Sequence, residues 1–178
     1  MASHSRLGDQ LVEIAGLLTR LGAPFALIGG LALAAHRVIR GTQDVDLLVD
    51  LDNASTIDAA LSKLGYRCLH RSPDAANYLR GDERLDFIYA SRPTARRLLA
   101  GALVRQTGFG TLQVVSAEGL IGFKLQALAN NPRRTQHMED IRALLRQNAG
   151  RLDLDEVRGY FRLFNRESTL DELLAEAR

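Results

Sequence analysis

The sequence contains a single cysteine, Cys68, and no apolar run long enough to span a membrane. One cysteine cannot form an internal disulfide, which excludes a disulfide-stapled scaffold and suits a reducing compartment. The first residues, Met-Ala-Ser-His-Ser-Arg, lack the apolar centre of a signal peptide. These absences predict a cytoplasmic protein with no membrane partner.

An excess of one sign of charge is also missing, because 23 Lys and Arg side chains nearly balance 21 Asp and Glu side chains. The net charge of +2 tolerates an anionic substrate without requiring one. Nucleic-acid binding would ask for clustered basic residues interleaved with aromatic ones, and the later aromatic residues fit an amphipathic helix better. A tRNA acceptor therefore remains open but unsupported by composition.

The chain has 178 residues, the size of one domain or of one domain with an appendage. A helical spacing of leucines up to Leu21 is followed by short apolar runs, two of which flank a hairpin turn at Gly81-Asp82. From Ser116 onward the pattern is helical, with breaks at 130–132 and 148–150. We predict an α/β (α+β) fold with a small mixed β-sheet flanked by helices in residues 1–115. Residues 116–178 are predicted to form a C-terminal helical region packed on that core.

Two carboxylates, Asp44 and Asp46, interrupt an apolar segment. Side chains alternate along a strand, so both acids face one side and Val45 faces the other. Adjacent carboxylates repel each other, and an apolar strand tolerates them most easily when a cation lies between them. Mg²⁺ is usually held by one or two carboxylates plus substrate phosphates, as in phosphoryl or nucleotidyl transfer. The alternative is a strand edge that presents both acids to solvent.

A third acid, Asp86, interrupts the apolar run from Leu85 to Tyr89. If this strand lies beside the strand of Asp44 and Asp46, three carboxylates converge on one shared cation site. Such a site could hold two cations that activate an attacking hydroxyl and neutralise a triphosphate. A single solvated acid at the start of a strand is the alternative.

The pair Gly29-Gly30 follows a short apolar run and precedes a short helical one. Glycine lets the backbone approach a phosphate closely, and a helix N-terminus offers free N–H groups and the positive end of the helix dipole. The pair therefore predicts a strand-to-helix turn that binds a triphosphate, with a tight turn that binds nothing as the alternative.

The order Gly29-Gly30, then Arg40-x-Thr42-x-Asp44-x-Asp46, then a lone Asp86 resembles the nucleotidyltransferases of the DNA polymerase beta superfamily. Within it, the chain looks like the minimal enzymes related to the abortive-infection toxins of type IV toxin–antitoxin systems. The resemblance spans residues 25–145 and implies transfer of a nucleoside monophosphate from a nucleoside triphosphate to a hydroxyl or similar acceptor. It implies that the three acids ligate Mg²⁺ or Mn²⁺ and that the glycines hold the triphosphate. Many members have Gly-Ser at this turn, so a serine hydroxyl to the phosphate is absent here.

Arg40 and Thr42 occupy motif positions in this resemblance and are expected to contact the nucleotide. A guanidinium can fork onto a phosphate, or onto Asp44 or Asp46 as a structural salt bridge, and both roles for Arg40 stay open.

Lys124 shares an apolar helical stripe with Ile121 and Leu128. A buried ammonium costs free energy unless an anion meets it, and the resemblance implies that this anion is the nucleotide. The alternative is a lysine whose stem covers apolar surface while its amine reaches water. Asp140 is expected in a first helical turn, where the helix dipole favours an acid, although similar proteins often pair such an acid with the helix lysine. His137 shows no metal-ligand spacing.

These patterns favour a metal-dependent nucleotidyltransferase whose acceptor is RNA, a protein or a small molecule. The expected partners are a nucleoside triphosphate, a tRNA or protein acceptor, and a cognate antitoxin. The alternative is a nucleotide-binding or toxin–antitoxin interaction module with little or no catalysis. The preferred triphosphate, the acceptor and the oligomeric state are not specified by the sequence.

Overall fold

The computed structural model describes residues 5–176. Its chain packs as two compact units, which are described separately. The first unit comprises the described residues up to Leu31 together with Gly41–Val115. The second comprises Ala32–Arg40 and the described residues from Ser116 onward.

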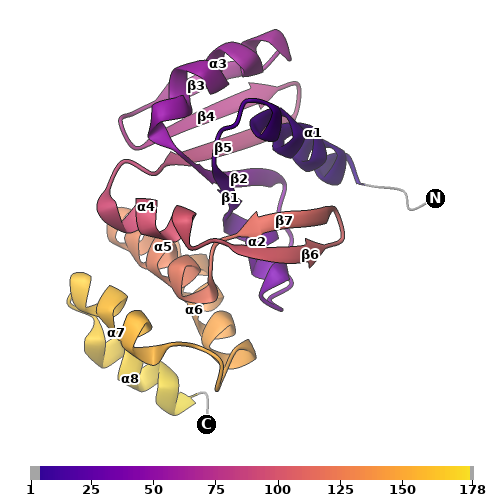
Figure 1. The fold of residues 1–178 in the computed structure, drawn as a ribbon. Helices are drawn as coiled ribbons and strands as arrows, with labels where there is room; N and C mark the ends of the chain where they lie inside the picture. The colour runs from indigo at the N-terminus through magenta and orange to yellow at the C-terminus, as the bar shows by residue number, and fades with distance from the viewer. Residues whose placement is uncertain (1–4, 177–178) are drawn as a thin grey trace. The chain divides into compact units, whose positions relative to one another are not determined.

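A seven-stranded mixed sheet, in the order β3-β4-β5-β2-β1-β7-β6, forms the centre of the first unit (Figure 1). Its strands are β1 (Phe25–Leu27), β2 (Asp44–Val49), β3 (Arg67–Arg71), β4 (Ala75–Arg80), β5 (Glu83–Tyr89), β6 (Leu103–Thr107) and β7 (Gly110–Val114). The helical segments of this unit are α1 (Arg6–Arg20), the 3₁₀ turn η1 (Leu51–Asn53), α3 (Ala54–Lys63) and α4 (Pro93–Ala100). Helix α2 (Gly29–Ala35) begins in the first unit and ends in the second.

The two faces of the sheet differ because its strands alternate. Tyr78 and Arg80 of β4 point to the face that α1 and α3 cover, where Tyr78 donates to Asp58 of α3 and Arg80 pairs with Glu13 of α1. Tyr78 also packs edge-on against Phe87 of β5, with ring centroids 5.6 Å apart. Both helices are seen next to these strands in Figure 1. This face is the apolar core of the unit, and the opposite face carries the acids.

Helix α2 begins at Gly29, so the glycine pair forms the start of the helix itself. Only three residues separate β3 from β4, because Ser72 closes a tight turn by pairing its backbone N–H with the Ala75 carbonyl at 2.8 Å. Asn53 occupies the N-cap position of α3 without a side-chain cap hydrogen bond, and Asp50 caps the preceding η1 by accepting from the Asp52 backbone N–H.

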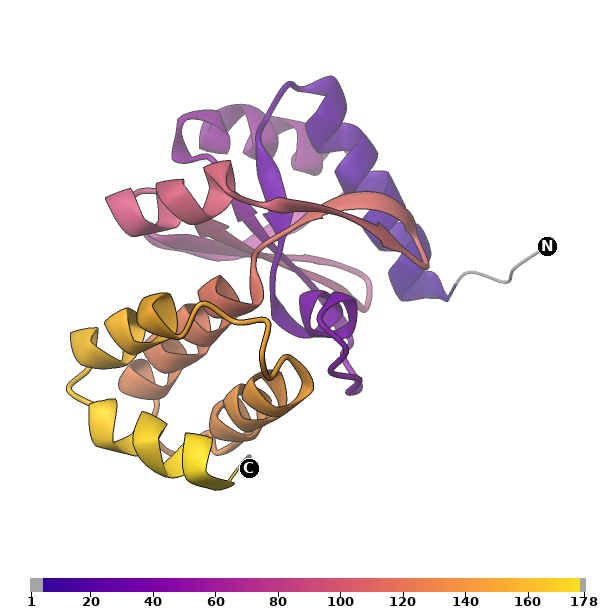
Figure 2. The same cartoon turned by 60° about the horizontal axis from the view of Figure 1, so that its bottom comes forward.

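The second unit is a group of helices, α5 (Ala117–Asn130), α6 (Gln136–Gln147), α7 (Leu154–Leu163) and α8 (Glu167–Glu176). Figure 2 shows α7 and α8 side by side. Helix α5 packs closely on α7 because Gly122 has no side chain, and a Cβ there would lie 3.0 Å from the Tyr160 ring. No helix within residues 5–176 combines the length and the apolar character that a bilayer crossing requires.

The segment Ala32–Arg40 belongs to this helical unit, although the sequence analysis assigns it to residues 1–115. Asn148 of α6 donates its side-chain amide to the His36 carbonyl at 3.1 Å. Arg40 forms an ion pair with Asp140 of α6. These polar contacts tie the end of α2 and the following loop to a helix more than 100 residues later.

Candidate active site

The strand register brings two of the predicted acids directly beside each other. Strands β2 and β5 are parallel, with Asp46 opposite Asp86 and Asp44 opposite Arg84. Residues paired across neighbouring strands point to the same face, so Asp44, Asp46 and Asp86 share the face that α1 and α3 leave open. All three are half-buried. The two strands that carry the acids are therefore adjacent, as convergence of the three carboxylates requires.

The surroundings of Asp86 perturb its carboxyl group. Burial raises the pKa of its carboxyl above the ordinary value, and the negative charge of Asp44 raises it further. Asn77 of β4 opposes both effects by donating its side-chain amide to Asp86 Oδ1 at 2.7 Å, and the charge of Arg84 acts in the same direction as Asn77. A half-buried carboxyl whose pKa is raised by burial and by a neighbouring acid is a functional-site signal rather than a stabilising feature.

The donor chemistry of this face suits Mg²⁺ held partly by substrate. Within residues 5–176, no three His, Cys, Asp or Glu side chains gather as a complete protein-only metal site. Mg²⁺ needs no such group, since it keeps several waters and commonly takes one or two carboxylates plus phosphate oxygens. Asp44 and Asp46 supply carboxylates in that number, and Asp86 lies next to them.

The glycine pair lies against the acid strand. Gly29 has φ +65°, in the left-handed region, and a Cβ there would lie 2.5 Å from Asp46 Cγ. A Cβ on Gly30 would lie 2.6 Å from Thr42 Cβ. The Ile28 backbone N–H donates to the Asp46 carbonyl at 3.0 Å, which holds this approach in place. The turn therefore requires glycine because the backbone passes directly over Asp46 and Thr42.

The helical unit holds a second cluster of charge. Lys124 of α5 contacts Asp140 of α6 with Nζ 2.8 Å from Oδ2, and their side chains are 9% and 2% exposed. Arg40 places Nε 3.1 Å from Oδ1 of the same carboxylate, and Gln136 donates its amide to that oxygen at 3.2 Å. The alternative in which Lys124 reaches water is wrong, because the ammonium is buried against an anion of the protein itself.

Asp140 was expected in a first helical turn, with pairing to the helix lysine as the alternative. Helix α6 begins at Gln136, so Asp140 lies beyond that turn, and the alternative holds: its buried carboxylate pairs with Lys124 and also with Arg40. His137 lies near this cluster, where burial and the charges of Lys124 and Arg134 lower its pKa. A signal was available in the sequence, since an acid on the apolar stripe of α6 and a lysine on the apolar stripe of α5 each need a partner.

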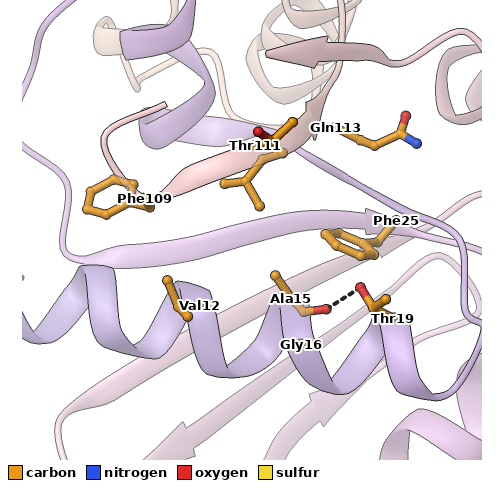
Figure 3. Close-up of a pocket in the computed structure, with 9 residues that line it drawn as sticks. Val12, Ala15, Gly16, Thr19, Phe25, Phe109, Thr111 and Gln113 are labelled. Carbon is orange, nitrogen blue, oxygen red and sulfur yellow. Dashed lines mark hydrogen bonds between the residues drawn. The ribbon is translucent and has the colours of Figure 1, made fainter. Parts of the chain in front are cut away.

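A cavity of about 360 Å³ lies elsewhere in the first unit, between α1 and the β6–β7 hairpin (Figure 3). Phe25, which lines it, pairs with Val49 on β2. Val49 is three residues beyond Asp46, so Phe25 faces the side of the sheet opposite the acids. The cavity walls are mainly apolar or small, as at Val12, Ala15 and Gly16, and it brings no titratable group to the acids.

The comparisons with known proteins establish the fold. No family model matches the chain. No curated protein matches it either. Among solved structures, ANT(2'')-Ia in complex with adenylyl-2''-tobramycin is similar at 20% identity, with 90% of this chain and 99% of that chain covered and a TM-score of 0.69.

Two further structures share the same arrangement. An antigenic nucleotidyltransferase-like protein from Paracoccidioides brasiliensis is 18% identical, with 95% of this chain and 92% of that chain covered and a TM-score of 0.55. The lincomycin-bound lincosamide adenylyltransferase LnuA is 14% identical over 76% of this chain and 94% of its own, with a TM-score of 0.53. The predicted mixed sheet flanked by helices is confirmed as the nucleotidyltransferase fold. Activity does not follow from identities this low.

Proposed function

We propose that this chain is a metal-dependent nucleotidyltransferase that moves a nucleoside monophosphate from a nucleoside triphosphate to the hydroxyl of an acceptor. One observation carries the proposal: Asp46 is directly opposite Asp86 on adjacent parallel strands while the Gly29 backbone lies against Asp46. A phosphate-binding turn and a row of carboxylates are the two parts that this transfer needs.

Each residue has a role in the proposal. Gly29 and Gly30 hold the triphosphate through backbone N–H groups, because a side chain at either position would fill the approach to Asp46 or Thr42. Asp44, Asp46 and Asp86 hold Mg²⁺ or Mn²⁺. When bound, the metal neutralises the charge of the phosphates and of the developing transition state.

The helical unit supplies positive charge in the proposal. Lys124 and Arg40 both form ion pairs with the carboxylate of Asp140. An ammonium and a guanidinium both bind phosphates, and we assign Lys124 and Arg40 to the nucleotide. Thr42, whose hydroxyl lies 3.4 Å from the Asp44 carbonyl, orders the loop that enters the acid strand.

The solved structures of the same fold guide the choice of the acceptor class to test first. ANT(2'')-Ia was captured with adenylyl-2''-tobramycin and LnuA with lincomycin. We therefore take a hydroxyl-bearing small molecule as the first acceptor class to test, with tRNA and protein acceptors next. The single exposed cysteine, Cys68, is consistent with our assignment of the reaction to the reducing cytoplasm.

The proposal is tested by label transfer. The protein is incubated with Mg²⁺ or Mn²⁺ and each α-phosphate-labelled triphosphate, together with antibiotics, total cell RNA or total cell protein. Asp46→Ala should abolish transfer, whereas the matched variant Asp52→Ala, an exposed acid in η1, should retain it. Asp46→Ala should also melt at the parent's temperature or slightly above it without metal, because it removes one of several repelling charges.

The outcomes separate enzyme from binding module. Label transfer that survives in Asp46→Ala contradicts the assignment of the acids. If the parent transfers no label but Mg²⁺-nucleotide still raises its melting temperature, the chain is a nucleotide-binding module, and a cognate antitoxin becomes the partner to seek.

A further inference from the structure

Asn77 is an uncharged polar residue that contacts Asp86 and is not part of the proposed motif. It lies at the middle of β4, directly opposite Asp86 in the antiparallel β4–β5 ladder. Its side-chain amide donates to Asp86 Oδ1 at 2.7 Å, and the residue is half-buried. A short amide-to-carboxylate hydrogen bond of this kind is stronger than one between neutral groups.

The two registers place Asn77, Asp86 and Asp46 in one row across three adjacent strands. Asp46 pairs with Asp86 across β2 and β5, and Asp86 pairs with Asn77 across β5 and β4. Paired positions point to the same face, so all three side chains share the open face. Asp86 therefore has a repelling carboxylate on one side and a hydrogen-bond donor on the other.

The position of Asn77 determines how its hydrogen bond affects the Asp86 carboxylate. A carboxylate beside another acid on the same face can rotate away from it unless a hydrogen bond fixes one of its oxygens. The Asn77 amide fixes Oδ1 of Asp86 in this way. Asn77 is itself held firmly because β4 is paired on both sides, by β3 and by β5.

We propose that Asn77 is a positioning residue for nucleotidyl transfer. It holds the Asp86 carboxylate beside Asp46 so that this carboxylate can bind a divalent cation. The inference rests on the proposed function and goes beyond it, because Asn77 belongs to none of the motif positions. Groups that hydrogen-bond to ligating carboxylates typically contribute 10–100-fold to metal affinity or activity.

The test measures Mn²⁺ binding by the full chain, followed through the electron paramagnetic resonance of free Mn²⁺. Asn77→Leu removes the donor while keeping the number and branching of side-chain heavy atoms, and Asn77→Gln keeps an amide but adds one methylene. Asn77→Leu should weaken Mn²⁺ binding about 10-fold or more, and Asn77→Gln should recover part of the loss. In an Asp86→Ala background, Asn77→Leu should have no further effect, which isolates the pairwise interaction.

A matched control exists in the same sheet. Thr111 of β7 donates its hydroxyl to Gln106 of β6 at 2.7 Å, a cross-strand bond of the same length between exposed side chains. Thr111→Val removes that bond and should leave Mn²⁺ binding unchanged, which excludes a general effect of losing one cross-strand bond.

The outcomes distinguish a failure of the Asn77 role from a failure of the proposed function. A folded Asn77→Leu variant that binds Mn²⁺ within twofold of the parent overturns the positioning role alone, and so does an equal loss in the Asp86→Ala background. A parent that binds no Mn²⁺ and transfers no label overturns the proposed function together with this inference. If the parent is active, Asn77→Leu should lower kcat about 10-fold or more while the KM for the triphosphate stays within twofold.

Discussion

The chain has one charge cluster in the sheet and another in the helical unit, and their charges are arranged differently. In the sheet, Asp44, Asp46 and Asp86 lie side by side, and the pKa of Asp86 is raised by burial and by a like charge. In the helical unit, the buried carboxylate of Asp140 is contacted by two cations, Lys124 and Arg40. One cluster gathers like charges, and the other pairs opposite charges.

The difference shows which cluster awaits a ligand. Like charges gathered on one half-buried sheet face cost stability, and such costs concentrate at functional sites. In a buried ion pair with good geometry, removal of either partner leaves an uncompensated charge and lowers stability. Substitutions in the two clusters should therefore have opposite effects on stability, which the following predictions exploit.

The largest effect on stability is expected in the helical unit. Asp140→Ala leaves the buried ammonium of Lys124 without its partner, and removal of one member of a buried pair typically costs about 3–5 kcal/mol. The free energy of unfolding, measured by urea denaturation, should fall by that amount. Asp46→Ala, measured in the same way without metal, should lose nothing.

The double variant Lys124→Met with Asp140→Leu serves as the control. Replacing a whole buried pair by apolar residues is often neutral, so the double variant should recover most of the lost stability. If Asp140→Ala and Asp46→Ala have equal effects on unfolding, the contrast between the clusters does not hold.

A second effect should appear at the glycine turn. Gly22 and Gly29 both adopt left-handed backbone, with φ +63° and +65°, but only Gly29 would press a Cβ against Asp46. Gly22→Ala should cost about 1–2 kcal/mol from backbone strain alone. Gly29→Ala should cost a further 1–3 kcal/mol or so from steric overlap, and it should weaken Mg²⁺-nucleotide binding, which Gly22→Ala should not.

Calorimetry of both variants checks this pair. Equal destabilisation of the two would mean that the backbone near Asp46 relaxes freely. Unchanged nucleotide affinity in a folded Gly29→Ala protein would remove the turn from the proposed site.

Local patterns in the sequence predicted the mixed sheet flanked by helices. The alternation around Asp44 and Asp46 and the turn at Gly81-Asp82 involve neighbours along the chain, and both strands form where expected. Strand positions counted outward from the two-residue turn pair Asn77 with Asp86. This neighbour of Asp86 could therefore have been predicted from the sequence as well.

The helical cluster could be predicted only in part. The apolar stripe of α5 showed that Lys124 is buried and needs an anion, but the identity of that anion depends on how α5 packs against α6. The inclusion of Ala32–Arg40 in the helical unit depends on contacts more than 100 residues apart along the chain, such as Asn148 to His36. Periodicity carries no information about such pairings, since it reports only which face of each helix is buried.

The smallest effect concerns pH and separates burial from charge pairing at Asp86. The pKa of this carboxyl is higher in the folded protein than its ordinary value of 3.8, so the folded state binds the proton more tightly than the unfolded state. The stability that comes from this proton is present below pH 3.8 and is lost as the pH rises through the folded pKa. Asp86→Asn, which stays neutral, does not lose it. In protein freed of divalent metal by a chelator, the free energy of unfolding of Asp86→Asn should therefore rise relative to the parent as the pH increases through this window. A difference that stays constant with pH, or that changes in the opposite direction, would mean that Asn77 and Arg84 already outweigh burial and the neighbouring acid at this position.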